Sequence, residues 1–418
     1  MTSCARWCIA IACVASATAN AVNDLAPDPA FGTAGRTLIG SLGPVPDQAT
    51  SVSTAGTGYL IGGYTVSGTP AVSGALLDGN GQPVTLFGTN GFRITGANGA
   101  PVPGAAFIDS QLRAVVAVNN PVAVARFLPN GDLDSSFAGD GTWNPADQSV
   151  VFDVALGPGD SVWVSKSLNN FANAELWQLS SSGVPTAYVF PGTTVLDFIP
   201  FGYARIHREP DGSFWWTARG LNQTGFDQVI FRFLASGAID TNYSGDGFAR
   251  LPVSCSAVEL GRRYQSLAVL AGGMAVVRGD YAGGSYLVAG FPDGTAGPAR
   301  CEDANGVIAT TDEIAPRDNR RFVAAAFNCR GDGACGALLR QFVVGPQGII
   351  VDDPPADLDA ATQFVTTTDG TTPDAEGTDV IFAQGKAVMA GYARRSASNS
   401  DYFVLRYVSP ILFDDGFE

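Results

Sequence analysis

The sequence is poor in lysine, histidine and charge. Only two of its 24 basic residues are lysines, Lys166 and Lys386, and His207 is the single histidine. Charged residues make up 15% of the chain, and the formal net charge is -15. A surface of this kind repels phosphate backbones, so nucleic acid is not an expected partner. A single histidine also excludes histidine-rich metal sites.

The usual sequence marks of catalysis are missing as well. Any Ser–His–Asp or Cys–His site would have to use His207, which lies in "YARIHREPDG" before an expected tight turn. The chain contains no G-x-S-x-G, no C-x-x-C and no Cys–His pair at zinc spacing. We therefore interpret His207 as an ordinary surface or core residue. The sequence predicts no catalytic, cofactor-binding or metal-binding residue.

Long apolar runs are absent, and the only membrane-directed feature is at the start. In "MTSCARWCIAIACVASATANAVND", Arg6 is followed by a short apolar stretch and by small-x-small sites ending at Ala19 and Ala21. This pattern predicts a signal peptide at 1–21, because the run is too short to span a bilayer. The alternatives are a short membrane anchor and a lipoprotein site at Cys13. The mature chain is expected to be secreted or on the surface of a Gram-negative type of cell, without a transmembrane segment.

Four cysteines remain after the signal peptide, and an even number in an exported chain favours disulfides. Cys255 and Cys301 follow similar segments in consecutive copies of a repeat described below, so we expect them to pair between neighbouring structural units. Cys329 and Cys335 are expected to pair across "RGDGA".

Glycine, by contrast, is abundant at 51 residues, and it punctuates a repeat. "ARFLPNGDLDSSFAGDG" begins at Ala125, and related stretches begin at Asp28, Ala75 and Phe231. Each has an aspartate, or another residue near that position, followed by an aromatic residue and a glycine turn. The aromatic position holds Phe31, Phe87, Phe137 and Tyr243.

A second element is a strand pair closed by a tight turn, and it occurs seven times at an average spacing of roughly 55 residues. One apolar residue marks the second strand of each copy: Leu60, Val115, Val162, Phe214, Ala275, Val323 and Val388. Four short strands repeated seven times predict an all-β fold, a seven-bladed β-propeller of four-stranded blades. We assign it to 22–409, followed by a short tail at 410–418.

The two chain ends predict how the ring closes. "YFVLRYVS" stops where other copies continue into the aspartate–aromatic segment, and "DPAFGTAGRTLI" at Asp28 is that missing half. The N-terminal strand should complete the C-terminal blade, with Phe31 in the buried aromatic position. Closure removes two open sheet edges, which gives the split a physical reason.

The stretches at Ala125 and Phe231 resemble the delta-60 repeat of secreted and surface bacterial proteins. In weaker form, the resemblance covers nearly all of the mature chain. The resemblance implies a propeller. It carries no catalytic residues. Three units, near residues 190, 295 and 345, lack the aspartate–aromatic signature. The ending "ILFDDGFE" resembles short tails on exported proteins of some Gram-negative bacteria.

Several residues have both a structural and a functional interpretation. Asp132, Asp134 and Asp140 suggest turn chemistry, with a calcium loop as the alternative. Tryptophans 163, 215 and 216 suggest packing between blades, with sugar stacking as the alternative. The Arg-Gly-Asp triplets at 278–280 and 330–332 suggest hairpin turns, with adhesion as the alternative.

The sequence favours an exported propeller that binds or displays something, and it names no ligand. A glycan or a surface protein is a possible partner. The main alternative is a propeller-type glycoside hydrolase or other polysaccharide-active enzyme that uses paired carboxylates. A third is a purely structural surface protein. An enzyme should gather acids and aromatic residues at one mouth of the central channel.

Overall fold

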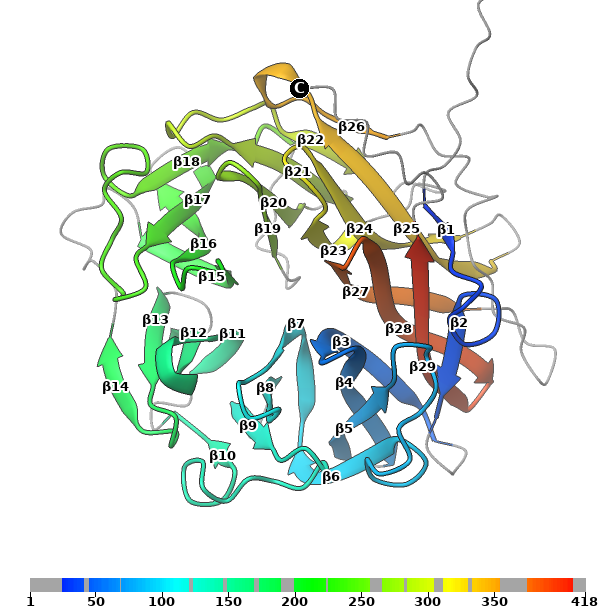
Figure 1. Ribbon diagram of the computed structural model, residues 1–418. Coiled ribbons are helices and arrows are strands. Elements are labelled where there is room, and N and C mark those ends of the chain that lie inside the picture. The colour runs from blue at the N-terminus through cyan, green and yellow to red at the C-terminus, as the bar shows by residue number, and fades with distance from the viewer. Residues whose placement is uncertain are drawn as a thin grey trace, which may run out of the picture.

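Seven antiparallel sheets follow one another around a ring in the computed structural model (Figure 1). The structure describes residues 25–40, 45–67, 69–119, 123–145, 149–168, 173–188, 199–222, 225–255, 265–281, 284–303, 311–329, 333–353 and 374–408. The predicted signal peptide and C-terminal tail lie outside these residues. Each sheet is one blade, numbered 1 to 7 here in chain order.

Blades 1 to 3 each contain four strands in sequence order. Blade 1 has β3 (Asp47–Ala55), β4 (Gly58–Ser67), β5 (Thr69–Leu77) and β6 (Phe92–Asn98). Blade 2 has β7 (Ala100–Ile108), β8 (Ala114–Asn119), β9 (Val124–Phe127) and β10 (Thr142–Trp143). Blade 3 has β11 (Val150–Leu156), β12 (Val162–Leu168), β13 (Asn173–Leu179) and β14 (Pro185–Tyr188), with a 3-10 turn η1 at Pro158–Asp160.

Blades 4 to 6 repeat this order. Blade 4 has β15 (Ile199–Arg208), β16 (Phe214–Asn222), β17 (Gly225–Phe233) and β18 (Phe248–Pro252). Blade 5 has β19 (Ser266–Leu270), β20 (Met274–Tyr281), β21 (Gly284–Gly290) and β22 (Arg300–Asp303). Blade 6 has β23 (Thr311–Pro316), β24 (Arg321–Cys329), β25 (Cys335–Val344) and β26 (Ile350–Asp352), with a 3-10 turn η2 at Pro346–Gly348.

Blade 7 joins the two ends of the chain, as the sequence predicts. It contains β27 (Ala375–Ala383), β28 (Lys386–Ser396) and β29 (Asn399–Val408), and β29 pairs with β1 (Ala26–Pro27) and β2 (Arg36–Ile39). Phe31 lies between β1 and β2 and is fully buried, like Phe137 and Tyr243 in their own blades. The predicted closure is therefore confirmed, and the blue N-terminal strands lie beside the red C-terminal ones (Figure 1).

The core lies between blades rather than within any one of them. In one cluster, Trp163 of blade 3 packs with Phe214 and Trp216 of blade 4. Trp163 and Phe214 have ring centroids 4.6 Å apart. All three predicted packing tryptophans are at most 1% exposed, which confirms the packing interpretation and leaves none free to stack on a sugar. A four-stranded sheet has two apolar faces, and stacking blades in a ring covers both.

Two disulfides join the predicted cysteine pairs. Cys255, just after β18, and Cys301 in β22 link blades 4 and 5, with 5.7 Å between Cα atoms. Cys329 and Cys335 link β24 to β25 inside blade 6, with 4.0 Å between Cα atoms. Such bonds favour an oxidising compartment. Within the described part of the chain, no helix has the length and apolarity to cross a membrane.

Candidate functional site

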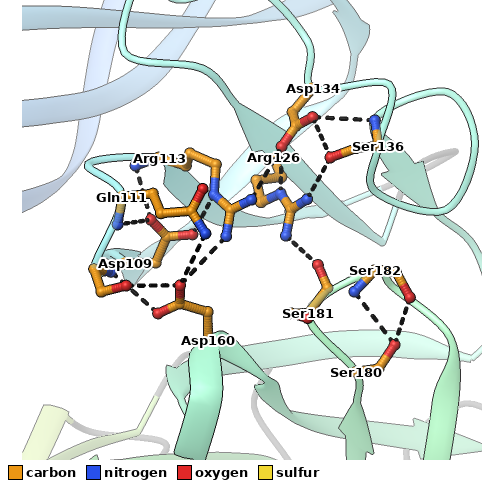
Figure 2. Close-up of polar contacts among 11 residues, drawn as sticks. Asp109, Gln111, Arg113, Arg126, Asp134, Ser136, Asp160, Ser180, Ser181 and Ser182 are labelled. Atoms are coloured by element: carbon orange, nitrogen blue, oxygen red, sulfur yellow. Dashed lines mark hydrogen bonds and ion pairs between the residues drawn. The ribbon is translucent and has the colours of Figure 1, made fainter.

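The repeat motif that dominates the sequence forms contacts between blades at the outer rim (Figure 2). Arg126 of β9 donates through Nε to Asp134 Oδ2 at 2.8 Å, and its guanidinium lies 4.7 Å from the centre of the Phe137 ring. Its Nη1 donates to the Ser181 carbonyl of blade 3. We call this arrangement of arginine, aspartate and aromatic ring a rim latch.

The same latch occurs in blade 7, where Arg406 bonds Asp28 at 2.7 Å and lies 4.6 Å from the centre of the Phe31 ring. Blade 4 has only part of it. Arg232 and Asp240 approach to 3.3 Å, but the guanidinium lies 5.3 Å from the centre of the Trp215 ring instead of over Tyr243. In all three blades, the residue after the aromatic donates its N–H to a turn of the next blade; the pairs are Gly32 to Asn80, Ala138 to Ser182 and Ser244 to Pro292. The motif therefore fastens consecutive blades.

The aspartates of the motif are occupied by these contacts and by local turns. Asp134 Oδ1 accepts the N–H and hydroxyl of Ser136, and Asp140 Oδ1 accepts both groups of Thr142. Asp132 pairs with Arg93 of blade 1. No group of three His, Cys, Asp or Glu residues that could hold a metal ion occurs among the described residues. These contacts agree with the turn interpretation of the loop.

The carboxylates of the latches in blades 2 and 7, Asp134 and Asp28, have lowered pKa values. Burial raises the pKa of Asp134, but the Ser136 hydroxyl and N–H and the Arg126 guanidinium outweigh it, so the pKa lies below its ordinary value. Asp28 follows the same pattern: burial raises its pKa, and the Ala30 N–H and Arg406 together bring it below the ordinary value.

The first Arg-Gly-Asp triplet is not displayed for recognition. The side chains of Arg278 and Asp280 are 3% and 8% exposed, and Arg278 Nη2 lies 2.7 Å from Asp280 Oδ1. Both sit in β20, inside blade 5. This placement removes the adhesion alternative at this triplet. The second triplet, at 330–332, lies outside the described residues.

A concave feature of the structure lies in the central channel. The first strands of the blades, β3, β7, β11, β15, β19, β23 and β27, line a cavity of ≈ 490 Å³. Each of these strands has one edge paired to its own blade and one edge facing the channel. Open edges carry unpaired N–H and C=O groups, which need partners when they are buried. We call this space the channel-mouth cavity.

Side chains at the cavity floor supply partners for several of these backbone groups. Asp153 Oδ2 accepts the N–H of Ile206 at 2.7 Å, and Asp379 Oδ2 accepts that of Val52 at 2.7 Å. Ser266 Oγ accepts the N–H of Ile314 at 2.9 Å. In every case the side chain belongs to one blade and the N–H to the next. Register shifts just before Asp153, Arg205 and Asp379 show bulges in the first strands, which re-aim side chains.

Arg205 supplies the complementary partners for carbonyl oxygens. Its guanidinium donates to the Gln265 and Pro103 carbonyls, both at 2.5 Å, and to the Phe152 carbonyl at 3.5 Å. It also pairs with Glu313. These partners belong to blades 2, 3, 5 and 6, so one side chain of blade 4 crosses the channel.

Blade 2 makes room for this arginine with a glycine. Gly104 has φ +66°, and a Cβ there would lie 3.0 Å from both Arg205 Nη2 and Glu313 Cδ. A side chain at this position would therefore be strained by the backbone and crowded by the guanidinium.

The floor carboxyls have pKa values opposite in direction to those at the rim. Burial raises the pKa of Asp153 to about 6, although Arg205 and the N–H groups of Ile206 and Val154 oppose it. Burial raises the pKa of Asp379 to about 7, and the Asp153 charge adds to the rise. Strongly shifted carboxyls in a cavity are typical of functional sites, although structural clusters show them too.

The wall above the floor is mostly apolar. It is formed by half-buried side chains at the ends of the first strands: Phe107, Ile108, Leu156, Ile206, Pro316 and Phe382. His207 also lines it, and burial lowers its pKa to about 4, so its imidazole is neutral near pH 7. The sequence did not predict that His207 lines a cavity.

No sequence pattern indicates the four charged residues that the fold brings together, Asp153, Arg205, Glu313 and Asp379. A partial signal is present. In blades 3 and 4, the residue three places after the second-strand marker, Ser165 or Thr217, lies opposite a charged residue, Asp153 or Arg205. In blade 7, Asp379 lies opposite Ala390, only two places after its marker. Blades 1 and 5 hold serines near this position, Ser51 and Ser266, so no repeat motif exposes it.

Comparison with known proteins supports the fold alone. No family model matches the chain, and no curated protein matches it. Polysaccharide lyase Uly1 is similar in structure, with 8% identity and a TM-score of 0.50 over 86% of this chain and 89% of that one. A protein of unknown function from Dyadobacter fermentans matches with 10% identity and a TM-score of 0.44 over 91% and 100% of the two chains. An endo-arabinanase from Bacillus licheniformis matches with 12% identity and a TM-score of 0.32, over 60% of this chain and 91% of that one.

Proposed function

We propose that this protein is an exported β-propeller that binds a ligand in the channel-mouth cavity and does not catalyse a reaction there. One observation carries the proposal. The cavity has an apolar wall and a polar floor, and the floor carboxylates are already engaged by the protein. Asp153 and Asp379 each accept two backbone N–H groups, and Glu313 pairs with Arg205.

This arrangement favours binding over glycoside hydrolysis. A hydrolase needs one carboxyl that is free to donate a proton and a second that attacks the sugar or activates water. At the floor, withdrawing Asp153 or Asp379 would leave backbone N–H groups of Ile206 or Val52 without a partner. The tryptophans that would stack on a polysaccharide are buried between blades.

Export is the second part of the proposal. The two disulfides favour an oxidising compartment, and the sequence begins with the pattern of a signal peptide. Secretion or display at the cell surface is consistent with both. Fractionation of cells that express the full chain tests this part. Recovery of the intact, uncleaved protein in the cytoplasm would contradict it.

The binding part is tested with a ligand panel, a hydrolase screen and two matched variants. Ala106→Trp should fill the cavity, because Ala106 lines it. Val351→Trp adds the same bulk at a side chain that is 45% exposed. We expect binding that Ala106→Trp abolishes and Val351→Trp preserves, without turnover. Turnover of a polysaccharide would support the hydrolase alternative. Complete absence of binding would support a purely structural protein.

A further inference from the structure

We infer that the ligand of the channel-mouth cavity is a small organic cation, with an ammonium group at the acidic floor and an apolar body against the wall. This inference rests on the proposed binding function and goes beyond it by naming the chemical class of the ligand. The charge balance of the floor, the position of Asp379 and the chemistry of the wall support it.

The floor has more negative than positive groups. Asp153, Glu313 and Asp379 line the cavity, and Arg205 is the one cation beside them among the described lining residues. Arg205 pairs with Glu313 and lies 3.7 Å from Asp153. No described arginine or lysine lies within ion-pair distance of Asp379. A buried carboxylate without a cation is costly, so a ligand cation would gain by supplying the missing charge.

Asp379 is placed to receive that charge. It is only 6% exposed, yet it lines the cavity. Its two oxygens accept the N–H groups of Val52 and Val380, which fix the carboxylate but do not neutralise it. Each carboxylate oxygen retains a second lone pair for a ligand N–H. Burial raises the pKa of Asp379 to about 7, although the N–H groups of Val52 and Val380 and the charge of Arg205 oppose the rise.

The wall indicates an organic cation rather than a metal ion. Phe107 and Phe382 line it beside aliphatic side chains, and aromatic faces attract ammonium groups. Arg317 already lies 5.7 Å from the centre of the Phe382 ring, so that ring can hold a cation. A cavity of ≈ 490 Å³ falls in the usual range for small-molecule sites. The described residues contain no cluster of three ligands suited to a metal.

The sign of the pH dependence follows from the groups that face Asp379. Asp153 comes from β11, Arg205 and His207 from β15, and Glu313 from β23, while β3 and β19 contribute uncharged side chains such as Ser53 and Ser266. Near pH 5, Asp379 and Asp153 are mostly protonated and attract a cation weakly. Near pH 8 both are ionised. Affinity for a cation should therefore rise across this interval, and binding near pH 6 should release protons.

Calorimetry on the mature full-length protein tests the inference with three probes of one shape: benzylammonium, benzyl alcohol and benzoate. At pH 8 we expect benzylammonium to bind at least about tenfold more tightly than benzyl alcohol, with benzoate weakest. At pH 5 the preference for the cation should shrink by about the same factor. Asp379→Asn should remove the preference for the cation without weakening the binding of benzyl alcohol. Asp140 is an exposed acid at the rim, so Asp140→Asn should leave the preference unchanged.

The outcomes separate this inference from the proposed function. If benzyl alcohol or benzoate binds as tightly as the cation, and Ala106→Trp blocks it, the cation inference is wrong and the binding function stands. If no probe and no ligand of the wider panel binds, both are wrong. If Asp379→Asn does not fold, Asp153→Asn and the pH dependence of the unaltered protein decide. An affinity for benzylammonium that is equal at pH 5 and pH 8 overturns the inference.

Discussion

The rim latches and the channel floor use the same kinds of group with opposite electrostatic results. At the rim, Arg126 serves Asp134, and the pKa of Asp134 lies below its ordinary value because Ser136 and Arg126 outweigh burial. In the channel, Arg205 pairs with Glu313 and lies 3.7 Å from Asp153, and burial raises the pKa of Asp379 to about 7 although Arg205 opposes the rise. An arginine nearby is therefore not enough to keep a carboxylate charged. The depth of burial, weighed against the nearby cations and the local hydrogen-bond donors, decides it.

This difference distinguishes the latches, which join blades, from the floor of the proposed ligand site. In a latch, the positive and negative groups balance, and the hydrogen bonds run to the next blade. The floor has its backbone groups satisfied but its charge unbalanced. A region of this second kind gains from a further cation, and a region of the first kind does not. Removing the parts of each region should therefore have different consequences.

Deleting 22–40 should give the largest effect, because it removes one latch together with two strands. Asp28 and Phe31 would be lost, and the outer edge of β29 would be exposed. Burial of one such aromatic ring contributes about 1.5–3 kcal/mol before the ladder hydrogen bonds are counted. We expect a clearly lower melting temperature and concentration-dependent association.

Thermal unfolding and light scattering measure both effects. A truncated protein that melts like the full chain would contradict the closed ring as a source of stability.

Arg205→Met should be the most harmful single substitution in the channel. It leaves Glu313 without its cation, and the carbonyls of Pro103 and Gln265 without their donor. Removing one partner of a buried ion pair typically costs about 3–5 kcal/mol. Urea unfolding measures the loss. Arg205→Lys keeps the charge but not the several donors and should recover part of it. A loss below about 1 kcal/mol for Arg205→Met would show that the floor is not needed to hold the channel.

Much of the fold was predictable because the sequence pattern is local. A turn, an aspartate and an aromatic residue recur within about seventeen residues, and strand pairs recur around them, so the blade count and the closing strand could be deduced. The role of Asp134 was only half predicted. Its turn contact with Ser136 is local, whereas the carbonyl that Arg126 binds comes from another blade.

The channel floor was not predictable for the same reason. Arg205 contacts Pro103 and Glu313, which lie 102 and 108 residues away along the chain. Those contacts exist only once the ring is closed, and the glycine that makes room for them is one of 51. A charged residue in one copy of a repeat resembles ordinary variation until the seven copies converge.

The two regions should respond to pH with opposite slopes. Asp153 and Asp379 have folded-state pKa values of about 6 and about 7, above the ordinary value of 3.8. The folded protein therefore binds protons more tightly there, and stability falls as pH rises from about 4 to about 7. At about 1.4 kcal/mol for each unit of pKa, the loss is on the order of 3 kcal/mol for Asp153 and about 4 kcal/mol for Asp379.

The variant with both Asp153→Asn and Asp379→Asn should lose this slope. Urea unfolding between pH 4 and pH 8 should show the variant gaining stability over the unaltered protein as pH rises, while Asp140→Asn stays parallel to it. Equal slopes in the double variant and the unaltered protein would place the titrating groups elsewhere.

The smallest effect should come from the latch of Asp134, and it should appear at the other end of the pH range. The folded-state pKa of Asp134 is lowered, because Ser136 and Arg126 outweigh burial, so its ionised form contributes stability above about pH 4 that is lost as pH falls through the folded-state value. Asp134→Asn weakens the bonds to Arg126 and should cost about 1–3 kcal/mol at pH 6. Near pH 3 the difference from the unaltered protein should narrow, because the unaltered carboxyl begins to take up its proton.

Ser136→Ala removes the hydroxyl that bonds Asp134 Oδ1 and keeps the Arg126 pair, so it should cost less at pH 6. Urea unfolding of the three proteins at both pH values measures these differences. If Asp134→Asn costs the same stability at pH 3 and pH 6, the latch acts through shape alone. Only the channel carboxyls would then make stability depend on pH.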